Sequence, residues 1–330
     1  MMRRRFLHAG LGLGALAALG DRAAAGADLL WRRRVLVGFG TTLTLQAAHA
    51  DEATLDRALD AAVATLRRIE AQMTLFNPDS ALARLNRDGQ LLAPPAELLY
   101  VLRLAQAVSR RSLGAFDVTV QPLWQTFEAA RKESRLPEPW EVADARARVD
   151  WRDLELSPQR LRLCRPGMGI TLNGIAQGHA ADRVRAVLAA HGIRHALVDA
   201  GEFAPMGHNA ERRPWTLGLA NPRDEVALMA RLTSDGRCIA TSADNLSSFS
   251  ADRRHHHIVD PRTGYSPPDL ASVTVVATSG AIADALTKVI FVAGPGRALT
   301  LARQWGVDAL WVDKAGAWQA TPGLRLARES

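Results

Sequence analysis

The sequence is poor in cysteine, lysine and tyrosine, and it has no long apolar run. Only two cysteines occur in 330 residues, Cys164 and Cys238. Their separation of 74 positions gives neither a disulfide framework nor the ligand spacing of a zinc site. Each lies in an apolar stretch, so we expect two buried, unpaired thiols. No segment approaches the roughly 20 consecutive apolar residues that a membrane-spanning helix needs.

Lysine is almost absent, although the chain is basic. Only three of the 41 basic residues are lysines, Lys132, Lys288 and Lys314, and the net charge is +7. Four arginines against one aspartate put +3 in residues 1–25, which leaves +4 on the remainder. No basic stripe carries the interleaved aromatic residues that stack on nucleic-acid bases, so the sequence argues against a nucleic-acid partner.

The amino terminus has the pattern of an export signal. Residues 3–7, Arg-Arg-Arg-Phe-Leu, precede an apolar run at 9–19 and a small-residue segment at 23–27 that offers cleavage after Ala25 or Ala27. Paired arginines before Phe-Leu resemble the twin-arginine type of signal. The alternatives are an uncleaved amphipathic start and a membrane anchor. We therefore predict a twin-arginine signal peptide at 1–27 and a periplasmic protein.

The remainder, 28–330, mixes helix and strand patterns. Apolar residues recur every 3.6 positions over 51–73, which predicts a long helix. The segment 161–172 predicts a hairpin around Arg165-Pro166-Gly167, and the charged stretch after 131 predicts a surface connection as far as 147. Further helices are predicted after the cap at 77–80 and at 94–111, 121–131, 176–191 and 282–293, with strands at 31–46, 195–200, 215–220, 230–232, 238–241, 272–278 and 310–318. Without a repeat or a linker, these elements predict one α+β domain.

Two segments have the composition of turns that contact a ligand. In 114–123, Gly-Ala-Phe-Asp-Val-Thr-Val-Gln-Pro-Leu, the glycine permits close approach of the backbone and Phe116 offers a flat ring. The alternative is an ordinary turn into a strand. In 171–178, Thr-Leu-Asn-Gly-Ile-Ala-Gln-Gly, a strand gives way to a helix whose first N–H groups can hold a phosphate. This segment is neither a Walker loop nor a GxGxxG fingerprint.

Three consecutive histidines occupy 255–257. Neighbouring positions on a strand face opposite ways, so at most two of them could share one metal ion. A single inward histidine beside Asp260 and Arg262 suits proton transfer or phosphate contact better. The alternative is a polar turn at Asp-Pro-Arg-Thr-Gly.

A carboxylate interrupts an apolar helix at Asp284. Thr287 follows one turn later on the same face. Carboxylate and hydroxyl oxygens are ligands that Mg²⁺ prefers, with phosphate oxygens completing its shell. The alternative is a carboxylate that interacts with the helix dipole.

Several collinear motifs together resemble one family, the FAD:protein FMN transferases, also called the ApbE family. They fall in order between about residue 37 and residue 294. The motifs are Phe-Gly-Thr at 39–41, where the family has Met-Gly-Thr, Ser-Ala-Leu-Ala-Arg-Leu-Asn at 80–86, the run at 114–123, Gly-Ile-Ala-Gln-Gly-His-Ala-Ala-Asp at 174–182, Ala-Thr-Ser at 240–242, His-Ile-Val-Asp-Pro-Arg-Thr-Gly at 257–264 and Ala-Asp-Ala-Leu at 283–286.

The resemblance implies a fold, a reaction and a site. The fold is a single ApbE-like, T-fold-related α+β domain, 28–330, with mixed or antiparallel sheets flanked by helices. The reaction is Mg²⁺-dependent transfer of FMN from FAD to a Thr or Ser hydroxyl of a redox protein, with release of AMP. The catalytic residues are His257, as the base, and Asp284. The FAD site consists of Phe39, Phe76, Ala115, Phe116, Asp117, Thr171, Gln177, His257 and Ile258, and the metal ligands are Gly174, Ala176, Asp284 and Thr287.

The usual acceptors of this family are periplasmic domains of membrane redox complexes, including those that serve nitrous oxide reductase maturation. Three positions depart from the family pattern: Thr171 replaces Asp, Gln177 replaces Lys, and Lys288 replaces Thr. Lys288 either restores the missing positive charge or crowds the metal. These departures leave open a non-catalytic flavin-binding accessory protein and an FAD pyrophosphatase. A metal-storage module built on the histidines is a third alternative.

Overall fold

The structure, a computed structural model, describes residues 29–245 and 247–328. The predicted export signal, 1–27, lies outside these residues. The main sheet is antiparallel throughout and has the strand order β1-β2-β6-β7-β10-β11-β12-β13. Its strands are β1 (Leu30–Gly38), β2 (Thr41–His49), β6 (His195–Asp199), β7 (Phe203–Met206), β10 (Cys238–Ala243), β11 (Leu270–Ala277), β12 (Asp308–Asp313) and β13 (Trp318–Ala320).

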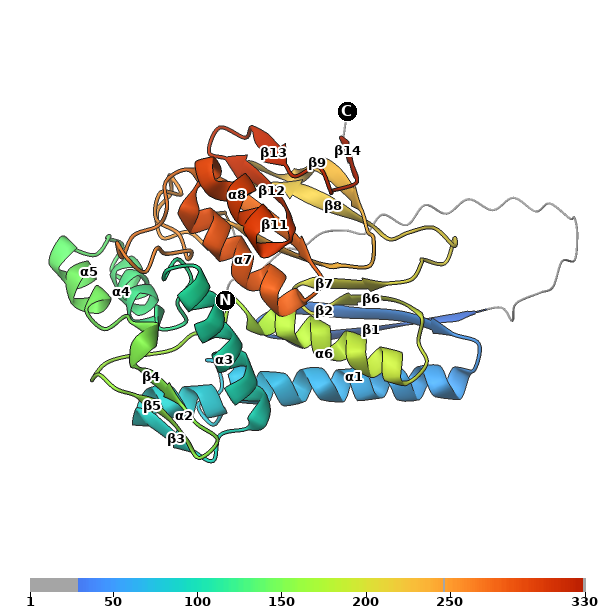
Figure 1. The fold of residues 1–330 in the computed structure, drawn as a ribbon, viewed down its shortest axis with the longest axis horizontal. Coiled ribbons are helices and arrows are strands. Elements are labelled where there is room, and N and C mark those ends of the chain that lie inside the picture. Colours follow the sequence, from blue (N-terminus) through green and yellow to red (C-terminus); the bar gives the residue numbers. More distant parts are fainter. Residues whose placement is uncertain (1–28, 246, 329–330) are drawn as a thin grey trace, which may run out of the picture.

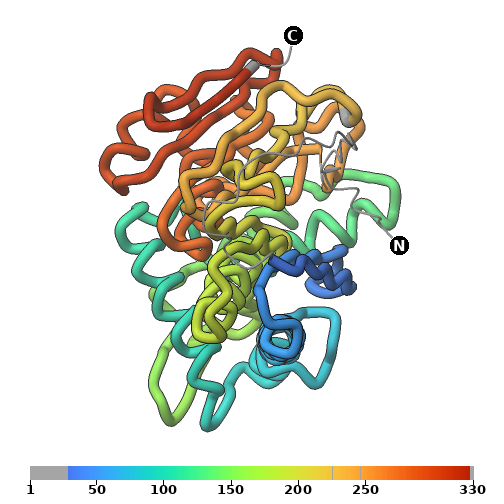
Figure 2. The backbone as a smooth tube through the Cα atoms, turned by 90° about the vertical axis from the view of Figure 1, so that its right-hand side faces the viewer, coloured from blue at the N-terminus to red at the C-terminus, as the bar shows by residue number. Residues whose placement is uncertain are grey.

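A row of four helices covers one face of this sheet (Figure 1). The helices are α1 (Glu52–Met73), α6 (Ala176–Ala190), α7 (Gly280–Ala293) and α8 (Pro295–Trp305). In Figure 2 α1 is seen along its axis, at the lower edge of the row. The side chain of Asp51 caps α1 by accepting from the amide of Thr54 at 2.8 Å, and the apolar stripe of the predicted helix at 51–73 is buried. The predicted long helix is confirmed.

A smaller sheet packs on the opposite face. It has the order β14-β9-β8, from β8 (Thr216–Asn221), β9 (Asp224–Thr233) and β14 (Leu326–Arg328). Because both faces of the main sheet are covered, all eight residues of β11 are buried. Val273 and Val275 face the helices, and Val276 faces the smaller sheet. The strand therefore buries the side chains of both faces, including the polar Ser272 and Thr274.

The remaining elements gather at one end of the helical row (Figure 1). They are α2 (Ala81–Asp88), α3 (Ala96–Arg111), α4 (Gln121–Lys132), α5 (Pro139–Arg146) and a three-stranded sheet of β3 (Gln90–Leu92), β5 (Arg160–Leu163) and β4 (Leu154–Leu156). A short 3-10 helix, Trp151–Asp153, precedes β4. We call this group the cap.

The predicted hairpin at 161–172 is wrong. The turn at 165–167 exists, with Gly167 at φ 75°, but its second arm does not return to β5. The amide of Ile170 instead donates to the side chain of Asn86 at 2.7 Å, and the amide of Thr171 donates to the carbonyl of Val118 at 2.8 Å. The backbone amides of this arm bond to partners that are distant in the sequence, and no local sequence pattern predicts those partners.

Two further predictions need correction. The segment predicted as a surface connection contains α5, which Pro139 begins and which a reciprocal capping box between Glu138 and Glu141 stabilises. Both cysteines are unpaired, as expected, but only Cys238 is buried and Cys164 is half-buried. Burial raises the pKa of the Cys238 thiol to about 12.

The predicted fold class is confirmed as a mixed α+β domain with antiparallel sheets flanked by helices. None of the helices in the described part of the chain is long and apolar enough to cross a membrane.

Candidate active site

A cavity of about 290 Å³ opens where the cap meets the main sheet and α6. Its lining residues come from eight separated stretches of the chain, which only the fold brings together. All nine residues predicted for the FAD site line it: Phe39, Phe76, Ala115, Phe116, Asp117, Thr171, Gln177, His257 and Ile258. Of the predicted metal ligands, Gly174 and Ala176 line the cavity, whereas Asp284 and Thr287 lie behind its wall, fully buried.

One wall begins at the β1–β2 turn. Phe39 has φ 50° and Gly40 has φ 74°, and two successive left-handed residues are what a two-residue type I′ turn requires. The amide of Phe39 donates to the carboxylate of Glu70 on α1 at 2.7 Å, which fixes the turn against the helix. Phe76, with 78% of its surface exposed, stands beside Gly40 at the mouth. Flat apolar rings therefore flank the entrance.

The segment 114–123 forms a second wall, and its carboxylate has a structural task. One oxygen of Asp117 accepts from the amide and the hydroxyl of Thr119 at 2.8 and 2.7 Å, and the other accepts from the amide of Trp151 at 3.0 Å. Burial raises the pKa of Asp117 and outweighs these three bonds, which lower it. Asp117 therefore shapes this loop, which presents the buried ring of Phe116 to the cavity.

The start of α6 forms the floor. It lies against α7, where a Cβ on Gly178 would come within 2.1 Å of the carbonyl oxygen of Gly280. This contact brings Asp284 close enough to accept from the amide of Gly178 at 3.2 Å. In the described structure, Ile175 precedes α6 without a side-chain cap. Ala176 and Gln177, the first two residues of α6, line the cavity, so the positive end of the helix dipole lies at its wall.

The predicted magnesium ligands are already engaged. Nζ of Lys288 lies 2.5 Å from Oδ1 of Asp284. The hydroxyl of Thr287 donates to the main-chain oxygen of Asp284 at 2.6 Å and lies 2.7 Å from the hydroxyl of Ser242. The structure does not unite the two side chains into an open set of oxygen donors, because an ammonium group covers the carboxylate and the hydroxyl faces the core. As they stand, these residues do not fit a Mg²⁺ site.

The three histidines occupy an irregular loop rather than the expected strand, and each has a different environment. The ring of His255 stacks on Phe127 with a centroid distance of 5.8 Å. His256 is fully buried, with its ring edge-on to Phe291 at 5.4 Å. His257 lines the cavity. Within 29–245 and 247–328, no three His, Cys, Asp or Glu side chains are placed to share a metal ion.

The ring of His257 is oriented by its own loop. Its Nδ1 lies 3.1 Å from the carbonyl oxygen of Ser247, and its amide donates to the same oxygen at 3.0 Å. A carbonyl can only accept, so Nδ1 carries the proton, and Nε2 is the basic nitrogen of the neutral ring.

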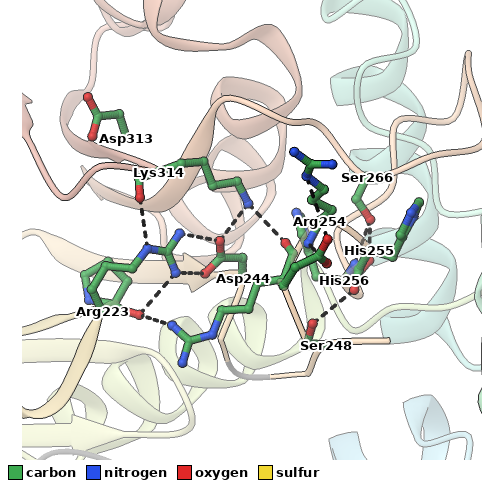
Figure 3. A network of polar contacts seen from close by, with 12 residues as sticks. Arg223, Asp244, Ser248, Arg254, His255, His256, Ser266, Asp313 and Lys314 are labelled. Carbon is green, nitrogen blue, oxygen red and sulfur yellow. Dashed lines mark hydrogen bonds and ion pairs between the residues drawn. The ribbon is translucent and has the colours of Figure 1, made fainter. Parts of the chain in front are cut away.

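A buried ion network holds the loop that carries the histidines (Figure 3). Arg223 grips Asp244 with two contacts of 2.9 and 2.7 Å, and Nζ of Lys314 reaches the same carboxylate at 2.7 Å. Lys314 also donates to the carbonyl of Arg253 at 3.2 Å. Burial raises the pKa of Asp244, but the two cations outweigh it and hold that pKa below its ordinary value. The network ties the loop to β10 and to the end of β12.

A family model described as the ApbE family matches residues 39–311, most of the chain. The chain belongs to the ApbE family. It is 30% identical over 267 residues to an FAD:protein FMN transferase of Haemophilus influenzae, covering 76% of this chain and 77% of that protein. It is also 30% identical over 289 residues to an FAD:protein FMN transferase of Treponema pallidum, covering 81% and 80%.

Solved structures of ApbE proteins share the fold. The ApbE protein of Thermotoga maritima superposes with a TM-score of 0.79 at 25% identity, over 89% of this chain and 97% of that one. The apo form of the flavinyl transferase ApbE of Pseudomonas stutzeri superposes with a TM-score of 0.75 at 26% identity, over 89% and 95%. The expected ApbE-like domain is confirmed.

The cavity of this ApbE family member also contains polar residues that were not among the predicted site residues. Glu202 is buried and accepts from the amide of Thr241 at 3.0 Å, and Ser242 also lines the cavity. The motif at 240–242 indicated this segment, but it did not predict that Thr241 bonds to Glu202 or that Ser242 lines the cavity. Glu202 follows the turn at Gly201 (φ 94°), against which Gln177 packs, and it has no local signature.

Proposed function

We propose that this chain is an FAD:protein FMN transferase that attaches FMN to a Thr or Ser hydroxyl of an acceptor protein and releases AMP. One observation carries the proposal: a single cavity joins aromatic walls, a helix start suited to phosphate, and a histidine with a basic Nε2. The names of the relatives support it, since they are FAD:protein FMN transferases. Phe39, Phe76 and Phe116 offer flat faces for the rings of FAD.

In the proposed reaction, His257 accepts the proton of the acceptor hydroxyl at Nε2. The hydroxyl oxygen attacks the phosphorus of the FMN half, and the bond from that phosphorus to the bridging oxygen breaks. AMP leaves with the electron pair of that bond. The contact from Nδ1 to Ser247 keeps the ring in the required tautomer. Asp284 acts through the residues that it holds rather than at the reacting atoms, because it lies behind the cavity wall.

The sequence predicts a need for Mg²⁺, but the side chains of Asp284 and Thr287 form no open ligand set for it, and no step above passes through the ion. The decisive experiment incubates the chain with FAD and candidate acceptors, with Mg²⁺ and with EDTA. In-gel flavin fluorescence on the acceptor and stoichiometric AMP support the proposal. AMP with free FMN would instead identify an FAD pyrophosphatase, and retained FAD without AMP an accessory flavin-binding protein. Bound zinc or iron without flavin would identify a metal-storage module.

The acceptor and the compartment form a further part of this proposal. The arginine pair and apolar run at 1–27 support export by the twin-arginine route and hence a periplasmic acceptor, such as a membrane redox subunit of the kind that serves nitrous oxide reductase maturation. Replacing Arg3, Arg4 and Arg5 by Lys preserves charge but should retain the precursor in the cytoplasm. Normal periplasmic recovery of that variant would rule out the twin-arginine route.

A further inference from the structure

Lys288 places a fixed positive charge at the wall of the cavity. Its Nζ lies 2.5 Å from Oδ1 of Asp284 and 3.2 Å from the main-chain oxygen of the same residue. The carboxylate is fully buried, whereas the lysine side chain is 18% exposed and lines the cavity. Because Asp284 cannot turn into solvent, it holds the ammonium group in one place.

That charge lies beside the start of α6. A Cβ on Gly174 would come within 3.3 Å of Cε of Lys288, so the lysine stem runs along the turn that begins the helix. The helix dipole already favours an anion at this point, and the ammonium adds to the same field. Among the described residues that line the cavity, Lys288 is the one side chain with a permanent positive charge, although arginine dominates the basic residues of the chain.

The surroundings of Asp284 leave little room for a second cation. Its Oδ2 accepts from the amide of Gly178, and its Oδ1 contacts Lys288. Thr287, the other predicted side-chain ligand, directs its hydroxyl to Ser242 and to the helix backbone. A divalent ion at this carboxylate would have to displace the ammonium group from a 2.5 Å contact.

We propose that Lys288, anchored by Asp284, is the cation that binds the diphosphate of FAD in this chain, in the place that the family resemblance gives to Mg²⁺. The inference rests on the proposed function and names the group that meets the phosphates. A lysine ammonium is a compact charge well suited to phosphate oxygens. It offsets the negative charge of the diphosphate in the bound state and as AMP departs. FAD binding is then independent of divalent ions.

The first test measures FAD affinity by flavin fluorescence, in EDTA and in Mg²⁺. The wild-type chain should bind FAD equally well in both. The ratio of its FAD affinities with and without Mg²⁺ should therefore be about one. Lys288→Met should weaken binding roughly 10- to 100-fold in EDTA, the value of a hydrogen bond to a charged group. Lys132→Met removes an exposed lysine at the end of α4 and is the matched control, with unchanged affinity expected.

The second test measures Mn²⁺ by electron paramagnetic resonance in the presence of FAD. The wild-type chain should bind no more Mn²⁺ than FAD alone does, whereas Lys288→Thr, which uncovers the carboxylate, should acquire a bound ion. Wild-type binding of FAD only with Mg²⁺, or equal affinity in Lys288→Met, would overturn the inference while FMN transfer stands. Absence of FAD binding under every condition would overturn the proposed function and this inference with it.

Discussion

The amide of Gly178 donates to the carboxylate of Asp284 across 3.2 Å, which joins the first turn of α6 to α7. This bond exists because the two helices meet at glycines, Gly178 on one and Gly280 on the other. The anchor of Lys288 is therefore set by helix packing rather than by a loop. Asp182 supports the same junction, since its carboxylate accepts from the amides of Gly280 and Ala281 at 2.7 and 3.1 Å.

Replacing Gly178 by Ala should separate these helices. The new Cβ would meet the Gly280 carbonyl oxygen at 2.1 Å, and backbone cannot move aside as a side chain can. We expect a loss of about 3 kcal/mol in the free energy of unfolding, the upper end of the usual cost of overpacking. Urea denaturation monitored by circular dichroism measures it.

Gly296→Ala is the matched control, because a Cβ at this position in α8 meets nothing within 4 Å. Alanine there should leave stability unchanged or raise it by up to about 1 kcal/mol. Equal denaturation midpoints for the two variants would show that the α6–α7 contact tolerates a methyl group.

Removal of the Asp244 carboxylate should loosen the histidine loop. Asp244→Ala leaves Arg223 and Lys314, each about one quarter exposed, without their shared buried partner. Breaking such a buried pair costs about 3–5 kcal/mol. As a control, Asp56→Ala removes an exposed pair with Arg34 and should cost less than about 1 kcal/mol. Thermal denaturation compares the stability of the two variants. Similar losses of stability would contradict a stabilising role for the ion network around Asp244.

Local sequence patterns predicted the elements whose signals are short-range. The helix over 51–73 follows from apolar periodicity, and the collinear motifs indicated nine residues that line one cavity, whose contact with FAD stays a prediction. Residues fixed by distant partners escaped prediction. Glu202 gains its place from a turn beside Gln177, and the arm at 169–172 pairs with Val118 and Asn86. Asp284 and Lys288 have the i, i+4 spacing of an intrahelical ion pair, but only the packing of α6 against α7 shows that the carboxylate is buried and bonded to the amide of Gly178.

Acid should destabilise the protein through His256. Burial, followed by the charges of His257 and Lys314, lowers the pKa of His256 to about 3, against the opposing effect of Asp244. The unfolded chain takes up this proton near pH 6.5, whereas the folded protein does not. Its contribution to stability is therefore complete above about pH 6.5 and falls by about 1.4 kcal/mol per pH unit toward pH 3. Unfolding of wild type and His256→Leu across this range measures the difference.

Asp199 provides a control, because its effect on the pH dependence of stability has the opposite sign to that of His256. Burial raises its pKa to about 6, so the folded protein takes up a proton there that the unfolded chain binds only near pH 3.8. The contribution of protonated Asp199 to the free energy of unfolding is therefore fully present below pH 3.8 and is lost as the pH rises through 6. Asp199→Asn should therefore change the pH slope in the direction opposite to His256→Leu. Parallel pH profiles for wild type and His256→Leu would show that His256 titrates normally in the fold.

Alanine variants of the three neighbouring histidines distinguish a transferase from a protein that only binds flavin. Because many residues share the contacts to FAD, His257→Ala should bind FAD within a few-fold of wild type, the small loss expected for one contact among many. Its rate of FMN transfer should fall by roughly 10²–10⁴, the usual contribution of a positioned base. His255→Ala should change the rate little, since that ring stacks on Phe127 outside the cavity. His256→Ala should lose stability through its buried ring and should retain its rate once corrected for the folded fraction.

A single-turnover assay at pH 7 with an acceptor peptide compares the variants. Equal rate losses in all three would indicate a shared metal site, and no loss in His257→Ala would remove the histidine from proton transfer.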